Sequence, residues 1–199
     1  MNLEEEKRLV MQDGVFRRID PNPTVDRIHI VNNFLSDEEI AEGNEILDSW
    51  TLMPWGGNPA VQVANKLSDK VFNYLKPIAD KSTQKIKELF SVDRELWPTD
   101  IQLGNWSIGG NAGLHTDTQN ADWTIYSSII YINDNFEGGV LSFPDLDFEY
   151  KPKVGDFVTF PGDYWHRVQT ITSGTRRTII DFYSYDLDRA DYFLFKKGS

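Results

Sequence analysis

The segment "WTIYSSIIYINDNFEGGVLSF", residues 123–143, decides the fold class of this chain. Two runs rich in β-branched and aromatic residues, 123–132 and 138–143, enclose a short stretch that contains Asn and Asp. Apolar runs bounded by turn-forming residues are typical of β-strands joined by tight connections. We therefore predict antiparallel β-structure for this part of the chain.

Similar short runs continue through the whole second half of the sequence. They alternate with Gly, Pro, Asn and Asp and occupy residues 100–108, 148–152, 155–160, 166–171 and 176–185. Many short strands at this spacing predict an antiparallel sandwich or barrel. The first half has a helical character, so the predicted class is mainly β with flanking helices (α+β).

The helices are expected near residues 36–50 and 66–90, after a short strand at 27–31. Ser36 and Glu39 have the spacing of a capping box at the start of the first helix. Pro77 is expected to kink the second helix or divide it in two. Residues 51–64 contain Pro and Gly at several positions and are expected to form an irregular loop.

Composition limits the kinds of protein that this chain can be. The sequence has 199 residues and a formal net charge of -11, and it contains no cysteine. A mean hydropathy of -0.45 argues against a membrane span, and the negative charge argues against a general nucleic-acid binder. Any metal must then be bound by His, Asp or Glu. The charged start "MNLEEEKRLV" is unlike a signal peptide, so we expect a cytoplasmic protein without a membrane partner.

Two regions are expected along the chain. Residues 1–25 would form an N-terminal arm, either helical or mobile, and residues 26–199 a single domain. The length suits one core of this size.

The three histidines of the sequence narrow the search for a metal site. His115 and Asp117 form an H-x-D pair, and strand alternation would turn both side chains to the same face. His166 follows a Pro-Gly turn and is the plausible distant partner. Two imidazoles and one carboxylate make the facial triad of non-haem iron(II) oxygenases. His29 alternates with apolar residues, and we expect it to be structural.

Arg176 is the candidate anion-binding residue. It opens a predicted core strand ten positions after His166, and a buried guanidinium requires an anionic partner. Its planar fork matches a carboxylate. The alternative is that Arg176 and Arg177 are surface residues of a hairpin.

Taken in order, these motifs resemble the iron(II)/2-oxoglutarate-dependent dioxygenases, and the prolyl 4-hydroxylase-like branch most of all. The resemblance covers roughly residues 27–185. It is carried by an opening strand and helix at 28–40 and by four further segments. These are "IQLGNWSIGGNAGLHTD" (101–117) with its H-x-D, "YINDNFEGGVLSFP" (131–144), "PKVGDFVTF" (152–160), and "HRVQTITSGTR" (166–176) with its final Gly-Thr-Arg.

The resemblance implies a double-stranded β-helix (jelly-roll) core packed by the N-terminal helices. It also implies that His115, Asp117 and His166 bind iron(II) and that Arg176 binds the C5 carboxylate of 2-oxoglutarate. Two further residues would contact this cosubstrate. The hydroxyl of Tyr131 would hold the same carboxylate, and Trp106 stands where many relatives carry a tyrosine. Indole donates one hydrogen bond but accepts none.

The implied reaction consumes dioxygen and 2-oxoglutarate, with ascorbate as an optional reductant, and releases succinate and carbon dioxide. A prolyl residue of a peptide or protein is the expected substrate. Halogenases related to this family lack the carboxylate ligand, so the presence of Asp117 predicts hydroxylation. Open alternatives are hydroxylation of a free amino acid, a small metabolite or an alkylated nucleobase, and non-oxidative binding by a cupin-like protein.

The sequence also suggests where the substrate enters. The loop containing Trp55, Gly56 and Gly57 and the stretch "TDTQNADW" (116–123) would frame the pocket mouth. Three aromatic residues are candidates for gripping a peptide or ring, although each is also an ordinary core residue: Trp123, Tyr164 and Trp165. Oligomeric state and regiochemistry stay open.

Overall fold

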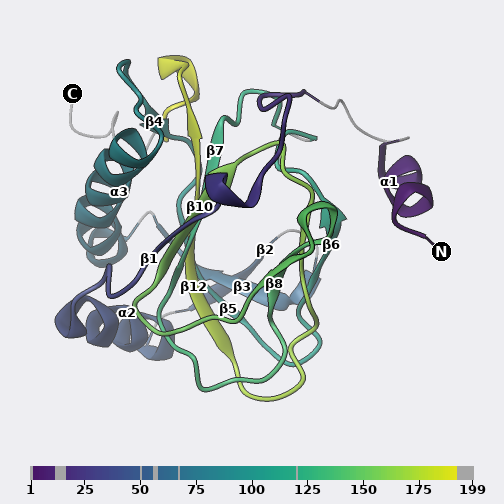
Figure 1. Cartoon of the computed structure of the whole chain (residues 1–199). Helices are drawn as coiled ribbons and strands as arrows, with labels where there is room; N and C mark the ends of the chain where they lie inside the picture. The colour runs from purple at the N-terminus through teal and green to yellow at the C-terminus, as the bar shows by residue number, and fades with distance from the viewer. Residues whose placement is uncertain are drawn as a thin grey trace.

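Two antiparallel sheets form the body of the protein in the computed structural model (Figure 1). The structure describes residues 2–11, 17–49, 51–55, 58–66, 68–119 and 121–191. The large sheet has the strand order β1-β10-β7-β12-β5-β3-β2, and β4 also pairs with β12. The small sheet has the order β6-β11-β8-β9. This arrangement confirms the predicted jelly-roll core.

The strands of the large sheet are β1 (His29–Val31), β2 (Leu52–Trp55), β3 (Asn58–Ala64), β4 (Trp97–Pro98), β5 (Gln102–Trp106), β7 (Tyr126–Tyr131), β10 (Phe157–Pro161) and β12 (Arg176–Ser184). Those of the small sheet are β6 (Ala112–His115), β8 (Leu141–Phe143), β9 (Phe148–Tyr150) and β11 (His166–Val168). The α-helices are α1 (Leu3–Met11), α2 (Asp37–Ser49) and α3 (Asp69–Leu89), with short 3-10 turns η1 (Val25–Arg27), η2 (Pro144–Leu146) and η3 (Leu187–Arg189).

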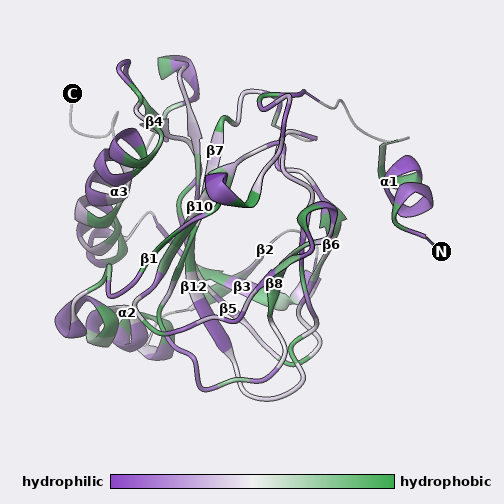
Figure 2. Cartoon of the chain, viewed as in Figure 1, coloured by the Kyte–Doolittle hydropathy of each residue, from purple (hydrophilic) through white to green (hydrophobic). Residues whose placement is uncertain are grey.

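The large sheet is covered on both faces, and its central strands β7 and β10 are buried along their whole length. Ile179 and Tyr183 of β12 belong to the core beneath α2 and α3, where these helices cover one face of the sheet (Figure 1). Successive side chains of a strand point to opposite faces, so Arg176 and Ile180 face the interior between the two sheets. Apolar colour lies along much of the sheet beside α2 and α3, while polar colour marks the outer sides of these helices (Figure 2).

Helix α2 begins with the predicted capping box. The Ser36 hydroxyl accepts a hydrogen bond from the Glu39 amide at 3.2 Å, and the Glu39 carboxylate accepts one from the Ser36 amide at 2.7 Å. Two amides that would lack partners at a helix start are thus satisfied. The neighbouring histidine, His29, packs edge-on against Phe90 with ring centroids 4.7 Å apart, which supports its structural role.

The prediction of an irregular loop over residues 51–64 is wrong, because strands β2 and β3 occupy most of this segment. Val61 and Val63 are buried, and β3 pairs with β5 through both of them. Pro54 lies in β2, which is an edge strand of the sheet. Proline is tolerated on an edge because no ladder hydrogen bond is lost there.

The division of the second helix at Pro77 is also wrong, since α3 runs unbroken from Asp69 to Leu89. Proline removes the hydrogen bond to the carbonyl four residues earlier, which belongs to Asn73. Both Asn73 and Pro77 are exposed, so water can bind that carbonyl. The buried residues Tyr74 and Ile78 hold the helix against the sheet on both sides of the proline.

The described part of residues 1–25 contacts the domain. Helix α1 lies beside the small sheet (Figure 1), where Lys7 forms an ion pair with Asp145 at 2.5 Å. The amides of Ile19 and Asp20 donate to the Asp163 carboxylate at 2.7 and 2.8 Å. The division between an arm at 1–25 and a domain at 26–199 stays a prediction. Among the described residues, no helix is long and apolar enough to cross a membrane.

Asp181 is a buried carboxyl group in the layer between the large sheet and the helices. It lies on β12 between Ile179 and Tyr183, and its Oδ2 atom has no hydrogen-bond partner among the described residues. Burial raises the pKa of Asp181 well above its ordinary value. The folded protein therefore favours the protonated acid.

Replacing Asp181 with Asn is expected to raise the melting temperature at neutral pH. The folded-state pKa of Asp181 is raised. Below its unfolded pKa of about 3.9, the side chain is protonated in both states and burying it costs no ionisation free energy. As the pH rises from there toward the folded-state pKa, the unfolded state loses its proton first, so the free energy of unfolding falls. The amide mimics the protonated acid and should flatten this slope. For a chain of this size, each kcal/mol shifts the melting temperature by about 2–4 °C.

Thermal unfolding between about pH 5 and pH 8 checks this expectation. The exposed Asp26, replaced by Asn, is the matched control and should leave the slope as it is. A melting temperature that is unchanged or lower at neutral pH in Asp181→Asn would contradict it.

Candidate metal centre and cosubstrate pocket

The two histidines of the predicted triad are cross-strand neighbours in the small sheet. His115 ends β6 and His166 begins β11, and the two residues pair directly in the antiparallel ladder. Their ring centroids lie 4.3 Å apart. Strand pairing therefore brings together two side chains that are far apart in the sequence.

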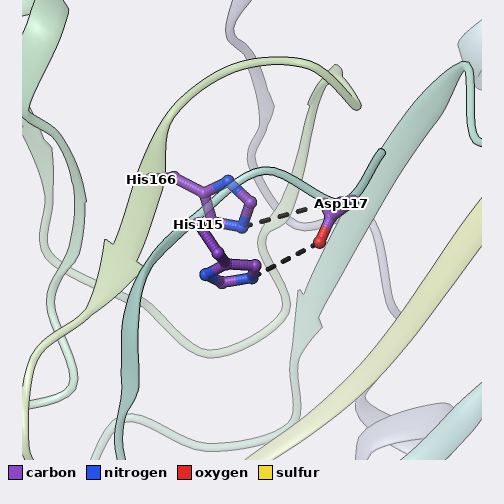
Figure 3. A group of neighbouring side chains, drawn as sticks. All are labelled: His115, Asp117 and His166. Carbon is purple, nitrogen blue, oxygen red and sulfur yellow. Dashed lines mark ion pairs between the residues drawn. The ribbon is translucent and has the colours of Figure 1, made fainter. Parts of the chain in front are cut away.

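Asp117 completes the cluster from a turn, which corrects the expectation that the H-x-D pair lies on one strand. Strand β6 ends at His115, and the Asp117 amide donates to the Gly162 carbonyl at 2.9 Å. The turn points the carboxylate between the two imidazoles (Figure 3). Its oxygens lie 3.4 Å from His115 Nε2 and 3.7 Å from His166 Nε2. One ligand atom from each residue lies within 4.8 Å of the others.

Backbone carbonyls orient both rings for metal binding. His115 Nδ1 lies 2.7 Å from the Gly113 carbonyl, and His166 Nδ1 lies 2.9 Å from the Tyr164 carbonyl. A ring that donates from Nδ1 presents its Nε2 lone pair, and metal-binding histidines are commonly held in this way. Both Nε2 atoms face Asp117 (Figure 3). This donor set fits a cation that prefers nitrogen and carboxylate ligands, such as iron(II).

The protonation states of His166 and Asp117 agree with a ligand role. Burial lowers the pKa of His166 to about 4, so this ring is neutral at physiological pH. Burial opposes the charge of Asp117, but the nearby His166 and His115 hold the pKa of its carboxyl below the ordinary value. The site thus offers a carboxylate together with a neutral imidazole.

Two phenylalanines that the sequence reasoning left unassigned fix the His166 ring. Phe160 packs edge-on at 4.8 Å and Phe143 lies at 5.9 Å between centroids. Phe143 is the last residue of the apolar motif "GGVLSF", and Phe160 is the last residue of the apolar motif "GDFVTF". Their recurrence at the end of strands was the signal that could have identified them.

Arg176 is fully buried at the start of β12, which removes the alternative of a surface residue. Its exposed fraction is 0%, and its Nε and one terminal nitrogen have no hydrogen-bond partner among the described residues. Arg176 lines the same inner cavity as His115, Asp117 and His166. An uncompensated buried guanidinium is strongly unfavourable. The cavity is therefore built to receive an anion.

The neighbouring Arg177 faces the opposite direction. Its guanidinium binds Asn44 at 2.7 Å and forms an ion pair with Asp48, both on α2. The alternation of β12 thus separates the two arginines, one toward the cavity and one toward the helix layer.

The double glycine of the "GGVLSF" motif lets the chain close around Arg176. Gly138 has φ +78°, and an added Cβ would lie 2.0 Å from the Thr170 carbonyl oxygen. Gly139 has φ +63°, and its Cβ would approach Arg176 Cδ at 3.0 Å. Only glycine adopts such conformations without strain in so tight a space.

Tyr131 and Trp106 lie beside the Arg176 guanidinium, and their expected contact with the cosubstrate stays a prediction. A terminal nitrogen of Arg176 lies 3.5 Å from the Tyr131 hydroxyl. The guanidinium carbon lies 5.0 Å from the Trp106 ring and 5.1 Å from the Tyr131 ring. Both rings are buried, and Trp106 also lines the inner cavity. The cation–π contacts position the guanidinium but do not use its N–H groups, which can therefore donate hydrogen bonds to a ligand.

Replacing Tyr131 with Phe is expected to weaken 2-oxoglutarate binding by about tenfold, because one hydrogen bond to a charged group contributes about 1.5 kcal/mol. Isothermal titration of the iron-loaded protein without oxygen measures this. Tyr150, whose hydroxyl binds Asp156 instead, gives the matched control Tyr150→Phe. An unchanged affinity in Tyr131→Phe would show that its hydroxyl does not reach the cosubstrate.

An outer cavity of about 500 Å³ opens onto the metal-binding residues. His115 and Asp117 line both this cavity and the inner one. Trp55 and Phe182 are also shared between them. A molecule in the outer cavity therefore has access to the metal-binding side chains.

The predicted substrate-gripping aromatics separate into two groups. Trp55 and Trp123 line the outer cavity as expected, whereas Gly56 and Gly57 lie outside the described residues. Tyr164 is buried, and its hydroxyl donates to Asp20 at 2.8 Å and accepts from the Thr24 amide at 2.9 Å. Trp165 is buried with Lys7 over its ring at 5.8 Å. Neither of the last two lines the outer cavity.

A jelly roll that carries this donor set beside a buried arginine is the arrangement expected of a 2-oxoglutarate-dependent oxygenase. Residues 101–185 match the model of the 2OG-Fe(II) oxygenase superfamily, which implies iron(II) and 2-oxoglutarate as cofactor and cosubstrate. Together with the fold and the donor set, this match supports a dioxygenase enzyme that is similar to the prolyl hydroxylases.

The relatives extend the match beyond the family model. A PKHD-type hydroxylase of Crocosphaera subtropica is 23% identical over 171 residues, which cover 75% of each chain. An oxidoreductase of the 2OG-Fe(II) oxygenase family from Burkholderia pseudomallei has the same fold. Its TM-score is 0.70 at 15% identity, covering 89% of this chain and 98% of the other.

A prolyl hydroxylase from Trichoplax adhaerens also has this fold. It was solved in complex with a peptide fragment of the hypoxia inducible factor oxygen degradation domain. Its TM-score is 0.60 at 16% identity, covering 83% of this chain and 86% of the other. Similarity at this level concerns the fold.

Proposed function

We propose that the protein hydroxylates an unactivated C–H bond of a prolyl residue in a peptide or protein. His115, Asp117 and His166 would hold iron(II), and Arg176 with Tyr131 and Trp106 would hold the distal carboxylate of 2-oxoglutarate. In the balanced reaction, one oxygen atom of dioxygen enters the C–H bond and the other enters succinate, with loss of carbon dioxide.

The observation that carries the proposal is the buried Arg176 with two unpaired nitrogens in the cavity of the metal-binding residues. A non-oxidative cupin-like protein has no use for a guanidinium in this place, whereas a dicarboxylate chelating a metal at one end reaches it with the other. Bidentate pairing of arginine with a carboxylate removes the cost of its burial.

Each group of residues has a distinct task. Iron(II) and 2-oxoglutarate, when bound, would supply the activation of dioxygen. The backbone carbonyls behind His115 and His166 keep Nε2 available for the metal, and Asp117 occupies the position that a halogenase leaves for chloride. Phe143 and Phe160 exclude water from the His166 side. The outer cavity holds the substrate carbon near the metal.

Anaerobic addition of iron(II) and 2-oxoglutarate tests the cofactor assignment. The expected result is a weak visible metal-to-ligand charge-transfer band that is absent without either component. No band would refute the oxygenase proposal and favour a binding protein.

Succinate release tests the substrate assignment. Proline-containing peptides should stimulate it and gain the mass of one oxygen. The structural relative with a bound peptide supports this choice. If a free amino acid or small metabolite stimulated succinate release and no peptide did, the assignment of a prolyl substrate would be refuted. The assignment as an oxygenase would be retained.

A further inference from the structure

The outer cavity has a surplus of negative charge, and this surplus bears on the substrate class of the proposed oxygenase. Besides the metal-binding residues, the charged side chains that line it are Asp100, Asp188 and Arg189. The inference below rests on the proposed function and deepens it.

Asp100 keeps one carboxylate oxygen available. Lys66 donates to its Oδ1 at 2.8 Å, and Gln102 donates to the same oxygen. Lys66 also pairs with Asp191 at 2.7 Å, so one ammonium group is shared between two carboxylates. Within the described part of the chain, Asp100 Oδ2 has no hydrogen-bond partner.

Asp188 is the second carboxylate of the cavity. It lies in η3, is exposed, and its side chain forms no ion pair or hydrogen bond with the described residues. The charge of Arg189, by contrast, is already engaged. Its guanidinium lies 4.1 Å from the Trp123 ring, and its Nε lies 3.9 Å from Asp186.

A buried hydroxyl points independently to a polar ligand. Thr124 lines the same cavity and has an exposed fraction of 0%. Its Oγ1 has no hydrogen-bond partner among the described residues. Buried polar groups are almost always satisfied, and an exception marks a place where a water or ligand group belongs.

We propose that the substrate carries a cationic group, an ammonium or a guanidinium, close to the carbon that is hydroxylated. Asp100 and Asp188 bind this cation, and the Trp55 ring of the same cavity offers a face for it. Such a cation has two sources: the side chain of a Lys or Arg beside the target residue of a peptide, or the amino group of a free amino acid.

Binding measurements distinguish the two sources. The probes are three acetylated and amidated peptides that are identical except for Lys, Gln or Glu next to proline, together with free L-lysine and L-arginine. Each is titrated into the protein loaded with iron(II) and 2-oxoglutarate without oxygen, with tryptophan fluorescence as readout. The Lys peptide should bind about tenfold more tightly than the Glu peptide, as expected for two partly exposed ion pairs. Added salt should reduce the difference.

The double variant Asp100→Asn/Asp188→Asn should lose this preference. Asp188→Asn alone, at an exposed position, tests the inference if the double variant folds poorly. Asp26→Asn, an exposed carboxylate that does not line the cavity, is the control and should keep the preference. Tight binding of the free amino acids, but of no peptide, would assign the cation to an amino group.

Equal binding of the three peptides without binding of the free amino acids would overturn the inference, as would a preference that survives the double variant. The charge-transfer band is recorded on the same samples. A missing band refutes the proposed function itself, whereas a band without charge preference refutes this inference alone.

Discussion

Replacing Arg176 with Ala is expected to raise the 2-oxoglutarate concentration required for half-maximal turnover by about 100-fold or more. Two charge-assisted hydrogen bonds to one carboxylate contribute about 3 kcal/mol together, which corresponds to about two orders of magnitude in affinity. Iron binding should change little, because the contacts of Arg176 within the described part of the chain are with Tyr131 and Trp106 and not with the three candidate metal ligands. Succinate release as a function of 2-oxoglutarate concentration measures the effect.

Arg176→Ala is also expected to change how the thermal stability of the protein depends on 2-oxoglutarate. Two guanidinium nitrogens of Arg176 are buried without partners, so removing the charge takes away a cost of the folded state. The wild-type protein should be stabilised against heat by 2-oxoglutarate through binding to the folded state, whereas Arg176→Ala should not respond. A cooperative melting transition of Arg176→Ala in the same experiment shows that the variant is folded.

Arg177→Ala is the matched control for Arg176→Ala. It removes a neighbouring arginine whose contacts are with Asn44 and Asp48, and it should keep the cosubstrate dependence of the wild type. If Arg176→Ala kept it too, the assigned role of Arg176 would be refuted.

Replacing Asp117 with Ala is expected to abolish hydroxylation and to weaken iron(II) binding by more than about 100-fold. Loss of residues that merely support a metal ligand costs about 10- to 100-fold in affinity, and loss of the ligand itself should cost more. Asp117 supplies the only carboxylate of the cluster. The charge-transfer band and an anaerobic iron titration measure the effect.

The fold should survive this change. Asp117 lies in a turn whose backbone is held by Gly162, and neither histidine depends on it for its backbone-facing hydrogen bond. Asp122→Ala, in the same stretch but outside the outer-cavity lining, is the control. Wild-type iron affinity and turnover in Asp117→Ala would eliminate the proposed metal centre.

The ligand set could be predicted from the sequence because its chemistry leaves few choices. With three histidines and no cysteine, a site with two nitrogen ligands requires two of three side chains. His29 belongs to an alternating apolar strand, which leaves His115 and His166. The order of the surrounding motifs then indicated Arg176 and Tyr131, and the structure places both in mutual contact.

Local patterns were less informative where tertiary contacts decide the conformation. Residues 51–64 have loop-like composition, yet β2 and β3 pair with each other and β3 also pairs with β5. Tyr164 is an aromatic residue of the kind that often contacts a substrate, but its hydroxyl forms hydrogen bonds with Asp20 and with the Thr24 amide. In both cases the partner is distant in the chain, and no local pattern identifies it.

By itself, the sequence predicted the fold class, the capping of α2 and the candidate metal- and anion-binding residues. The fold class and the candidate metal ligands rest on hydrophobic periodicity and on scarce residue types, and the role of Arg176 toward 2-oxoglutarate rests on the family resemblance. Only the tertiary structure decided how they meet: His115 against His166 in one ladder, Asp117 turned between them after β6 has ended, and Arg176 facing inward while Arg177 faces α2. Register and the direction of a turn depend on contacts between distant segments, and each shift by one residue along a strand reverses the face that a side chain occupies.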